Sequence, residues 1–321
     1  KNIVIGGNMP VGESLRSQLF INSEKVGDFV EITLPATGED EESEIARIHY
    51  LEAGVGEPLL LIHSLGQSLY TWRNVFAELS DNYRVIAMDL PGHGYSSRPD
   101  TFNYTADDFA FILNGFLDAL NIKSAHMVGF SIGAMYMMRF LSLYPTRVAN
   151  CIAISPGGIT EYMPALVHNL QKPMIATFAR NLYTATDVRK MLLECVSDPA
   201  LIDDYVVKQY YEPVSDGLAR EALMYALRNY DQETIAEGLL PVEHEVLVLW
   251  GKNDRWHPPS GSVYFQSVLR AGRYYLVRNA GHLLQEEAPT KLLEIIYSYI
   301  PPAVPSYDVY RYTQNLAEDQ E

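Results

Sequence analysis

Three residues of this chain have the types and the order that nucleophilic catalysis by serine requires. Ser131 lies at the centre of a Gly-x-Ser-x-Gly stretch, and Asp254 and His282 each follow an apolar run farther along the chain. A serine hydroxyl is a weak nucleophile at neutral pH and needs a base that takes its proton as it attacks. Histidine suits that role, and a carboxylate orients its ring and stabilises the imidazolium that forms. The pattern predicts a Ser131–His282–Asp254 triad that forms a covalent acyl-enzyme.

The residues around Ser131 predict a sharp turn between a strand and a helix. Residues 125–128 read as a buried strand and residues 134–141 as a helix. A Gly-x-Ser-x-Gly stretch in that setting is typical of a nucleophile elbow, in which the turn strains the serine backbone and the glycines remove Cβ atoms that would collide. We therefore expect the serine hydroxyl at the top of a sheet, beside the positive end of a helix dipole.

The order of the three residues is itself informative. Each follows an apolar strand, and the carboxyl ends of parallel strands meet at one edge of a sheet. The order Ser131, Asp254, His282 is the one that α/β-hydrolases use. From about Arg47 to Tyr299 the chain resembles the α/β-hydrolase superfamily, and the Asp-x-x-Gly-x-Gly-x-Ser stretch at 89–96 looks like the turn that supports the oxyanion loop there.

The resemblance also implies an oxyanion hole made of two backbone N–H groups. One belongs to Ile132, the residue after the nucleophile, and the other to Leu65, in a loop at 63–68 that looks like the His-Gly loop of the superfamily. Ser64 stands where glycine is usual in that loop. If this position needs a positive φ, serine is strained there; the alternative is a loop of another shape in which the Ser64 hydroxyl reaches the substrate.

The predicted fold is of the α/β class: an α/β-hydrolase fold with a mostly parallel, doubly wound sheet and an inserted helical cap. From Leu59 onward predicted strands alternate with helices, which is typical of a parallel sheet. The alternating runs 28–34 and 46–51, joined through the acidic residues 39–42, predict an antiparallel hairpin at the edge of the sheet. A helix over 105–120 is expected to begin at the N-cap Thr105.

The domain boundaries follow from a break in this alternation. We expect residues 1–156 and 244–321 to form the core, with 1–24 and 301–321 peripheral, and residues 157–243 to form the cap. Four helical stretches are predicted in the cap, at 163–185, 187–196, 201–211 and 217–237. The cap is rich in methionine and aromatic residues, which favours an adaptable apolar pocket wall; these are Met163, Met174, Phe178, Tyr183, Met191, Tyr210, Tyr211, Met224 and Tyr225.

The composition favours a globular protein with a sizeable core. The chain has 321 residues, 48% of them hydrophobic, and its 24 basic and 40 acidic residues give a net charge of −16. Binding to nucleic acid requires clustered lysine and arginine, so neither nucleic acid nor an anionic membrane is expected as a partner. There is no apolar run long enough to predict a membrane span. Cys151 and Cys195 lie in separate segments and imply no disulfide framework, which fits a cytoplasmic protein.

No cofactor and no metal are expected, because the chain lacks His-Glu-x-x-His and clustered Cys/His spacings. The expected partner is a small-molecule substrate. The tail at 301–321 contains three tyrosines that could dock on the body or on a second copy, so a homodimer stays open. Among the other histidines, His63 and His93 are expected to brace loops near the site, and His257 is a second candidate for the base.

The preferred interpretation of these features is hydrolysis of a carboxylic ester or lactone of a mostly apolar small molecule. Two alternatives use the same triad: hydrolysis of a carbon–carbon bond in a diketone-like substrate, and perhydrolase or haloperoxidase-like activity. The carbon–carbon hydrolases usually carry asparagine where this chain has Phe130, whereas the Phe-Ser pair resembles perhydrolases. Epoxide hydrolases and haloalkane dehalogenases place aspartate where this chain has Ser131. A non-enzymatic alternative is a small-molecule receptor on the same fold.

Overall fold

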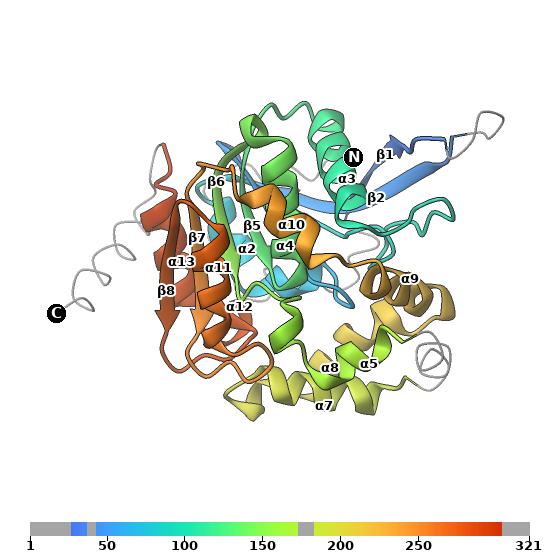
Figure 1. Ribbon diagram of the computed structural model, residues 1–321, viewed down its shortest axis with the longest axis vertical. Coiled ribbons are helices and arrows are strands. Elements are labelled where there is room, and N and C mark those ends of the chain that lie inside the picture. The colour runs from blue at the N-terminus through green and yellow to red at the C-terminus, as the bar shows by residue number, and fades with distance from the viewer. Residues whose placement is uncertain (1–26, 37–42, 173–182, 304–321) are drawn as a thin grey trace.

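A central β-sheet organises the molecule, seen in a computed structural model that describes residues 27–36, 43–172 and 183–303 (Figure 1). Among these residues, eight strands form one sheet in the order β1-β2-β4-β3-β5-β6-β7-β8. β1 (Asp28–Thr33) pairs antiparallel with β2 (Ile45–Ala53), and β2 pairs antiparallel with β4. All other pairs in this sheet are parallel, which confirms the predicted mostly parallel sheet with its antiparallel edge. The acidic residues 39–42 lie outside the described residues.

The register of the parallel strands sets the level of the loops that follow them. These strands are β3 (Pro58–Ile62), β4 (Arg84–Met88), β5 (Ala125–Phe130), β6 (Val148–Ile154), β7 (Val246–Gly251) and β8 (Gly272–Val277). Ile62 in β3 is the partner of Gly129 in β5, and Gly251 in β7 is the partner of Val277 in β8. The loops after β3 and β5 therefore leave the sheet side by side, and so do the loops after β7 and β8. These four loops carry the candidate site residues.

Helices cover both faces of the sheet (Figure 1). One face packs on α2 (Arg73–Ser80), α12 (Leu284–Glu287) and α13 (Pro289–Tyr299), and the other on α3 (Ala106–Ala119), α4 (Ile132–Leu143) and α11 (Ser262–Val268). Alternation along β3 divides its side chains between the two cores, because successive residues of a strand point to opposite faces. Leu59 and Leu61 are buried on the α2 and α13 side, whereas Leu60 and Ile62 are buried on the α3 and α4 side.

Local signals explain where two of these helices begin. At α3 the Thr105 side chain accepts from the Asp108 N–H while the Asp108 carboxylate accepts from the Thr105 N–H, a capping box that satisfies otherwise unpaired groups. This confirms the N-cap expected at Thr105. The last helix, predicted over 290–299, includes Pro289 because proline is favoured at the first helical position. The seven-residue helix α11 was not predicted.

Between β6 and β7 the chain forms the helices α5 (Ala165–Leu170), α7 (Ala185–Cys195), α8 (Asp204–Tyr211), α9 (Gly217–Arg228) and α10 (Gln232–Leu239). The first four lie together beyond one end of the sheet (Figure 1). α10 instead packs beside α4, where Arg139 donates to the Thr234 carbonyl at 3.4 Å. Short 3-10 turns also connect elements of the chain: η2 (Leu69–Trp72), η3 (Pro145–Arg147), η4 (Thr160–Tyr162), η5 (Pro199–Leu201), η6 (Glu212–Val214) and η7 (Pro259–Gly261).

Two predicted helices of this segment were wrong in extent. The continuous helix predicted over 217–237 is divided into α9 and α10, because the Asp231 carboxylate accepts from the N–H groups of Glu233 and Thr234 and so begins a new helix. The helix predicted over 163–185 is represented by α5, which ends at Leu170. Residues 173–182 of that prediction lie outside the described part of the chain.

Candidate active site

Ser131 occupies a strained turn between β5 and α4. Its backbone has φ 54° and ψ −124°, an unfavourable conformation for a residue with a Cβ, and strain of this kind is characteristic of functional sites. The Ser131 N–H donates to the carbonyl of Ile154 at 2.9 Å, which fixes the turn to β6. A Cβ on Gly133 would lie 2.0 Å from the His63 carbonyl oxygen, so only glycine fits at that position. The sharp, strained turn predicted here is confirmed.

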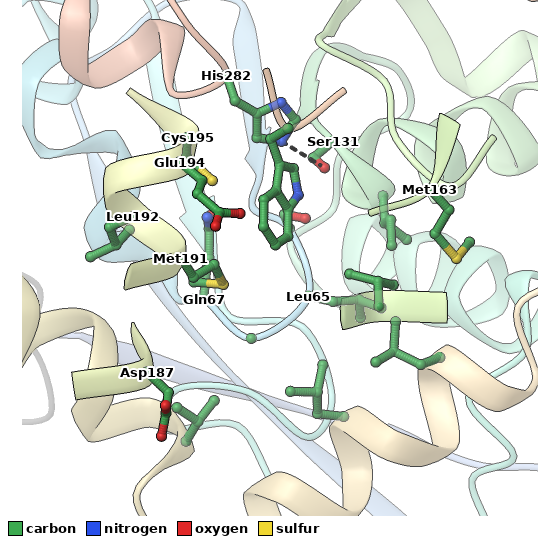
Figure 2. A pocket seen from close by; sticks show the side chains of 18 of the residues that line it. Leu65, Gln67, Ser131, Met163, Asp187, Met191, Leu192, Glu194, Cys195 and His282 are labelled. Atoms are coloured by element: carbon green, nitrogen blue, oxygen red, sulfur yellow. Dashed lines mark hydrogen bonds between the residues drawn. The ribbon is translucent and has the colours of Figure 1, made fainter. Parts of the chain in front are cut away.

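The structure brings Ser131, His282 and Asp254 together. His282 Nε2 lies 3.2 Å from Ser131 Oγ (Figure 2). Its Nδ1 lies 2.8 Å from Asp254 Oδ2. All three residues are buried: Ser131 and Asp254 are each 4% exposed, and His282 is 3% exposed. With Nδ1–H donating to the carboxylate, Nε2 is left as the acceptor that faces the serine hydroxyl. Such an arrangement can take a proton from the serine and hold the resulting imidazolium beside a carboxylate.

The second carboxylate oxygen of Asp254 is also occupied. Asp254 Oδ1 accepts from the backbone N–H groups of Trp256 and His257 at 2.9 and 2.8 Å. These bonds fix the orientation of the carboxyl group, so that Oδ2 points at the imidazole of His282. The turn after β7 thus supplies both the carboxylate and the donors that hold it.

The His282 loop is attached to the end of helix α7. The His282 N–H donates to the Cys195 carbonyl at 2.7 Å, and the Glu287 carboxylate accepts from the N–H groups of both Gly281 and Ser197. Burial raises the pKa of Glu287, although the backbone hydrogen bonds oppose that rise. Glu287 was not predicted to have a role at the site, because its partners are backbone groups and leave no motif.

The Asp254 loop is attached to the same helix end. Arg255 donates to the carbonyl oxygens of Leu193 and Val196 at 3.2 and 3.1 Å. Cations near the last carbonyls of a helix satisfy acceptors that the helix itself leaves unpaired. The C-terminal end of α7 therefore contacts both loops that carry the partners of Ser131.

The loop after β3 places Leu65 beside the nucleophile. Leu65 and Ile132 line the same cavity as Ser131, so both residues proposed for the oxyanion hole are at the site. Ser64 also lines that cavity and is not one of the described residues with positive φ, which in this loop falls at Gly66 with φ 70°. The backbone strain considered for Ser64 is therefore absent, because glycine occupies the strained position two residues later.

A buried network around Asp89 holds this loop. Asp89 accepts from His49 Nδ1 and from the N–H groups of Leu69 and Tyr95. Burial alone would raise the pKa of Asp89, but the His49 and His63 side chains and the Leu69 N–H keep it below its usual value. His63 accepts from the Leu90 N–H at 2.9 Å, which joins the loop at 63–68 to the turn at 89–96.

The two histidines expected to brace loops do so as neutral rings. His63 Nδ1 donates to the Ser64 carbonyl at 2.6 Å, and His93 Nδ1 donates to the Pro91 carbonyl at 2.9 Å. Burial lowers the pKa of His63, and burial with the neighbouring His63 ring lowers the pKa of His93 to about 3.

A cavity of about 500 Å³ opens over Ser131 and His282 (Figure 2). Its other walls come from the helices between β6 and β7, with Met191 and Leu192 on α7 and Met163 before α5. Four of the methionine and aromatic residues predicted for a pocket wall line it: Met163, Tyr183, Met191 and Met224. Among the others, Met174 and Phe178 lie outside the described residues, and the cavity lining does not include Tyr210, Tyr211 or Tyr225.

His257, the second candidate for the base, also borders the cavity but lacks the partners of a triad histidine. Its ring centroid lies 5.1 Å from that of His282, and its Nδ1 is buried without a hydrogen-bond partner among the described residues. A base needs a partner that stabilises its charged form. The geometry favours His282 for that role.

Within residues 27–36, 43–172 and 183–303, no cluster of three or more histidine, cysteine or acidic side chains has a geometry that could hold a metal ion. In the same residues no helix combines the length and apolar character needed to cross a membrane. Cys151 and Cys195 are free and buried, and burial raises the pKa of Cys151 to about 12.

The doubly wound sheet and the turn at Ser131 are those of an α/β-hydrolase, and the chain belongs to the alpha/beta hydrolase fold family, whose family model matches residues 57–289. It is 28% identical over 253 residues to the uncharacterized hydrolase YugF of Bacillus subtilis, which covers 78% of this chain and 92% of that protein. It is 24% identical over 263 residues to a 2-hydroxy-6-oxo-2,4-heptadienoate hydrolase of Pseudomonas putida, which covers 78% and 91%.

A solved structure agrees with these relatives. The meta-cleavage product hydrolase from Pseudomonas fluorescens IP01 superposes with a TM-score of 0.67 at 25% identity, over 79% of this chain and 94% of that one. The fold class predicted from the sequence is thus confirmed, and the protein is a hydrolase of this family.

Proposed function

We propose that the chain is a serine hydrolase in which Ser131 is the nucleophile, His282 the general base and acid, and Asp254 the group that orients His282. The observation that carries this proposal is the continuous chain of contacts Ser131 Oγ–His282–Asp254 on the wall of a cavity. The backbone N–H groups of Leu65 and Ile132 would stabilise the oxyanion, a contribution of about 3–4 kcal/mol for each donor.

The bond that is cleaved is, in this proposal, a carbon–carbon bond beside a ketone. Relatives of the chain include hydrolases of 2-hydroxy-6-oxo dienoates, at 24–27% identity. In such a substrate, once the 2-hydroxydiene has shifted to its 2-oxo form, Ser131 Oγ adds to the 6-oxo carbon and its proton passes to His282. The adjacent carbon–carbon bond then breaks, its electron pair moves into conjugation with the 2-oxo group, and His282 returns the proton to the resulting dienolate, which becomes a 2-hydroxydienoate. Water activated by His282 releases the carboxylic acid from the acyl-enzyme.

In this proposal one anionic end of the substrate contacts a cationic side chain of the cavity wall. Most of the cavity lining is apolar, and its charged residues are the cations Lys190 and Arg220 and the carboxylates Asp187 and Glu194. Lys190 lies 4.0 Å from Asp187, which leaves Arg220 as the better candidate for an anionic group. Arg220 is half-buried, and its Nε has no hydrogen-bond partner among the described residues. A guanidinium is well suited to a carboxylate because its N–H groups match carboxylate geometry.

We propose further that residues 157–243 act as a cap over the site. The support is that α7 and α9 supply cavity walls that face Ser131 across the opening, through residues such as Met191 and Met224. A wall of flexible methionine side chains adapts to ligands of different shape.

Hydrolysis of a carboxylic ester or lactone is the second candidate. One observation favours it: Phe130, directly before the nucleophile, places an apolar ring 4.9 Å from the ring of His282. Phe130 offers no polar group that could bind an oxygen of the substrate other than the carbonyl oxygen, and hydrolysis of an ester does not require such a contact.

The test is turnover of a 2-hydroxy-6-oxo-2,4-dienoate, followed by loss of the conjugated dienol absorbance, beside a panel of simple esters and lactones. Wild-type protein is expected to cleave the dienoate, and Ser131→Ala and His282→Ala should each remove nearly all turnover, with no further loss in the double variant because the residues act as a unit. The matched control is Ser142→Ala, a serine in the last turn of α4 that does not line the cavity. If only esters or lactones are turned over, the result supports the second candidate, ester or lactone hydrolysis. An undiminished rate in Ser131→Ala would refute both candidates.

A further inference from the structure

A second imidazole, that of His257, lies near Ser131, and both residues border Gly157. A Cβ placed on Gly157 would lie 2.8 Å from Ser131 Oγ and 2.9 Å from His257 Nε2. The serine hydroxyl and this ring nitrogen therefore border the same small space over Gly157. Both residues line the cavity, so a substrate attacked by Ser131 brings its neighbouring atoms against His257.

The position of His257 is set from both sides of its backbone. Its N–H donates to Asp254 Oδ1 and its carbonyl accepts from Trp250 Nε1, both at 2.8 Å. The residue is 4% exposed, and its ring lies against that of His282. A ring held in this way loses little conformational freedom when a ligand binds, which is the condition for a specific contact.

Within the described residues, the His257 ring has a nitrogen, Nδ1, that makes no hydrogen bond. Burial lowers the pKa of His257 well below its ordinary value, and the neighbouring His282 lowers it further, so the ring is neutral and carries one N–H. Nδ1 is buried without a partner in the described part of the chain, and a buried N–H without an acceptor is costly. The proton is therefore best placed on Nε2, the nitrogen beside the cavity, where a ligand oxygen can accept it.

We propose that His257 is a specificity-determining residue that donates a hydrogen bond from Nε2 to an oxygen substituent of the substrate, one or two atoms from the carbonyl carbon that Ser131 attacks. The proposal rests on the proposed serine mechanism, whichever bond is cleaved, and adds to it a preference: carbonyl compounds with an ether, hydroxyl or oxo oxygen close to the cleaved bond are favoured over those without one. The polar residues of α7 that line the cavity, such as Asp187 and Glu194, are more exposed and belong to a different wall.

The test uses pairs of esters that differ only in whether a CH2 group is replaced by oxygen. On the acyl side the pair is p-nitrophenyl methoxyacetate and p-nitrophenyl butyrate, and on the leaving-group side it is methoxymethyl acetate and propyl acetate. For each pair the readout is the ratio of kcat/KM for the oxygen-containing ester to that for the hydrocarbon ester. Comparing this ratio between variants cancels intrinsic reactivity and any general loss of activity.

His257→Val is expected to lower this ratio by about 5- to 10-fold in at least one pair, the usual effect of losing one neutral hydrogen bond. His257→Asn, which keeps an N–H donor, should recover part of the preference, and Met191→Leu, a change at another cavity residue, should leave the ratio unaltered. An unchanged ratio in His257→Val for both pairs would overturn the proposal while Ser131-dependent turnover continued. Turnover that survives Ser131→Ala would instead refute the serine mechanism, so the two failures are distinguishable.

Discussion

The main-chain N–H of His282 donates a 2.7 Å hydrogen bond to the carbonyl oxygen of Cys195, the last residue of α7. The same helix presents Met191 and Leu192 to the cavity. The loop that carries the proposed base is thus bonded to a helix that lines the cavity. Glu287 strengthens this junction, since its carboxylate accepts from N–H groups on both sides of it.

Glu287→Gln is expected to reduce kcat about 10-fold, since small misplacement of a catalytic group is costly. An amide has one acceptor oxygen where the carboxylate has two, and its NH2 group faces a backbone N–H. KM should change less than kcat, because the junction positions His282 rather than the substrate. Steady-state kinetics of Glu287→Gln measures this, with Glu243→Gln on the exposed surface as control. A kcat equal to that of the wild type would show that the His282 loop keeps its position without this carboxylate.

The Arg73–Glu286 pair should matter for stability. It is largely buried, with side chains 17% and 5% exposed, and Tyr210 of α8 also donates to Glu286. Burial alone would lower the pKa of Arg73, but the adjacent Glu286 carboxylate raises it. Arg73→Met leaves a buried carboxylate without its cation and is expected to cost about 3 kcal/mol of unfolding free energy.

Urea denaturation measures that loss. The double variant Arg73→Met with Glu286→Leu should be more stable than Arg73→Met alone, because no uncompensated charge remains. Arg84→Met breaks a pair at the surface, with Glu52, and should cost no more than about 1 kcal/mol. Equal losses from the two arginine substitutions would contradict the assigned role of burial.

Stability should fall as the pH is lowered below neutral, in part through His93. Its folded-state pKa of about 3 lies below the ordinary histidine value, so between these two values the unfolded chain takes up a proton that the folded protein does not. This contribution is complete above the unfolded pKa and is lost as the pH falls toward the folded one, at about 1.4 kcal/mol per pH unit.

Unfolding free energies of wild type and His93→Gln at pH 7 and pH 5 test this prediction. The wild type should lose about 2 kcal/mol more than the variant over that interval. Other titrating groups contribute to both proteins and cancel in the comparison. An identical pH dependence would show that His93 is already accessible to protons in the folded state.

The sequence predicted those parts of the site that depend on strand ends. Ser131 and His282 lie 151 residues apart and meet because each follows a parallel strand. The strained turn was predictable because its flanking residues show where the strand ends and where the helix begins. The capping box at Thr105 was predictable because both of its members lie within one helical turn.

Contacts between distant backbone groups could not be predicted in this way. Glu287 bonds the N–H of Ser197, 90 residues away, and a backbone partner leaves no trace in residue type. The division between α9 and α10 was missed because the apolar spacing continues across it, and a single capping carboxylate, Asp231, decides the outcome. The place of His257 beside Ser131 depends on the close approach of Gly157, which only the folded chain shows.

The ladder positions Ile62–Gly129 and Gly251–Val277 have a consequence for how the site tolerates change. Each pairing can shift only by whole residues, so the alignment of the Ser131 turn with the loop at 63–68, and of the Asp254 loop with the His282 loop, changes in steps of one residue. Exchanges among the buried leucines and isoleucines that pack on the sheet change the stability of these strands, but they do not change the strand register. Substitutions in the helices between β6 and β7 can therefore change the cavity wall while the strand register keeps the loops of Ser131, Asp254 and His282 at the same level.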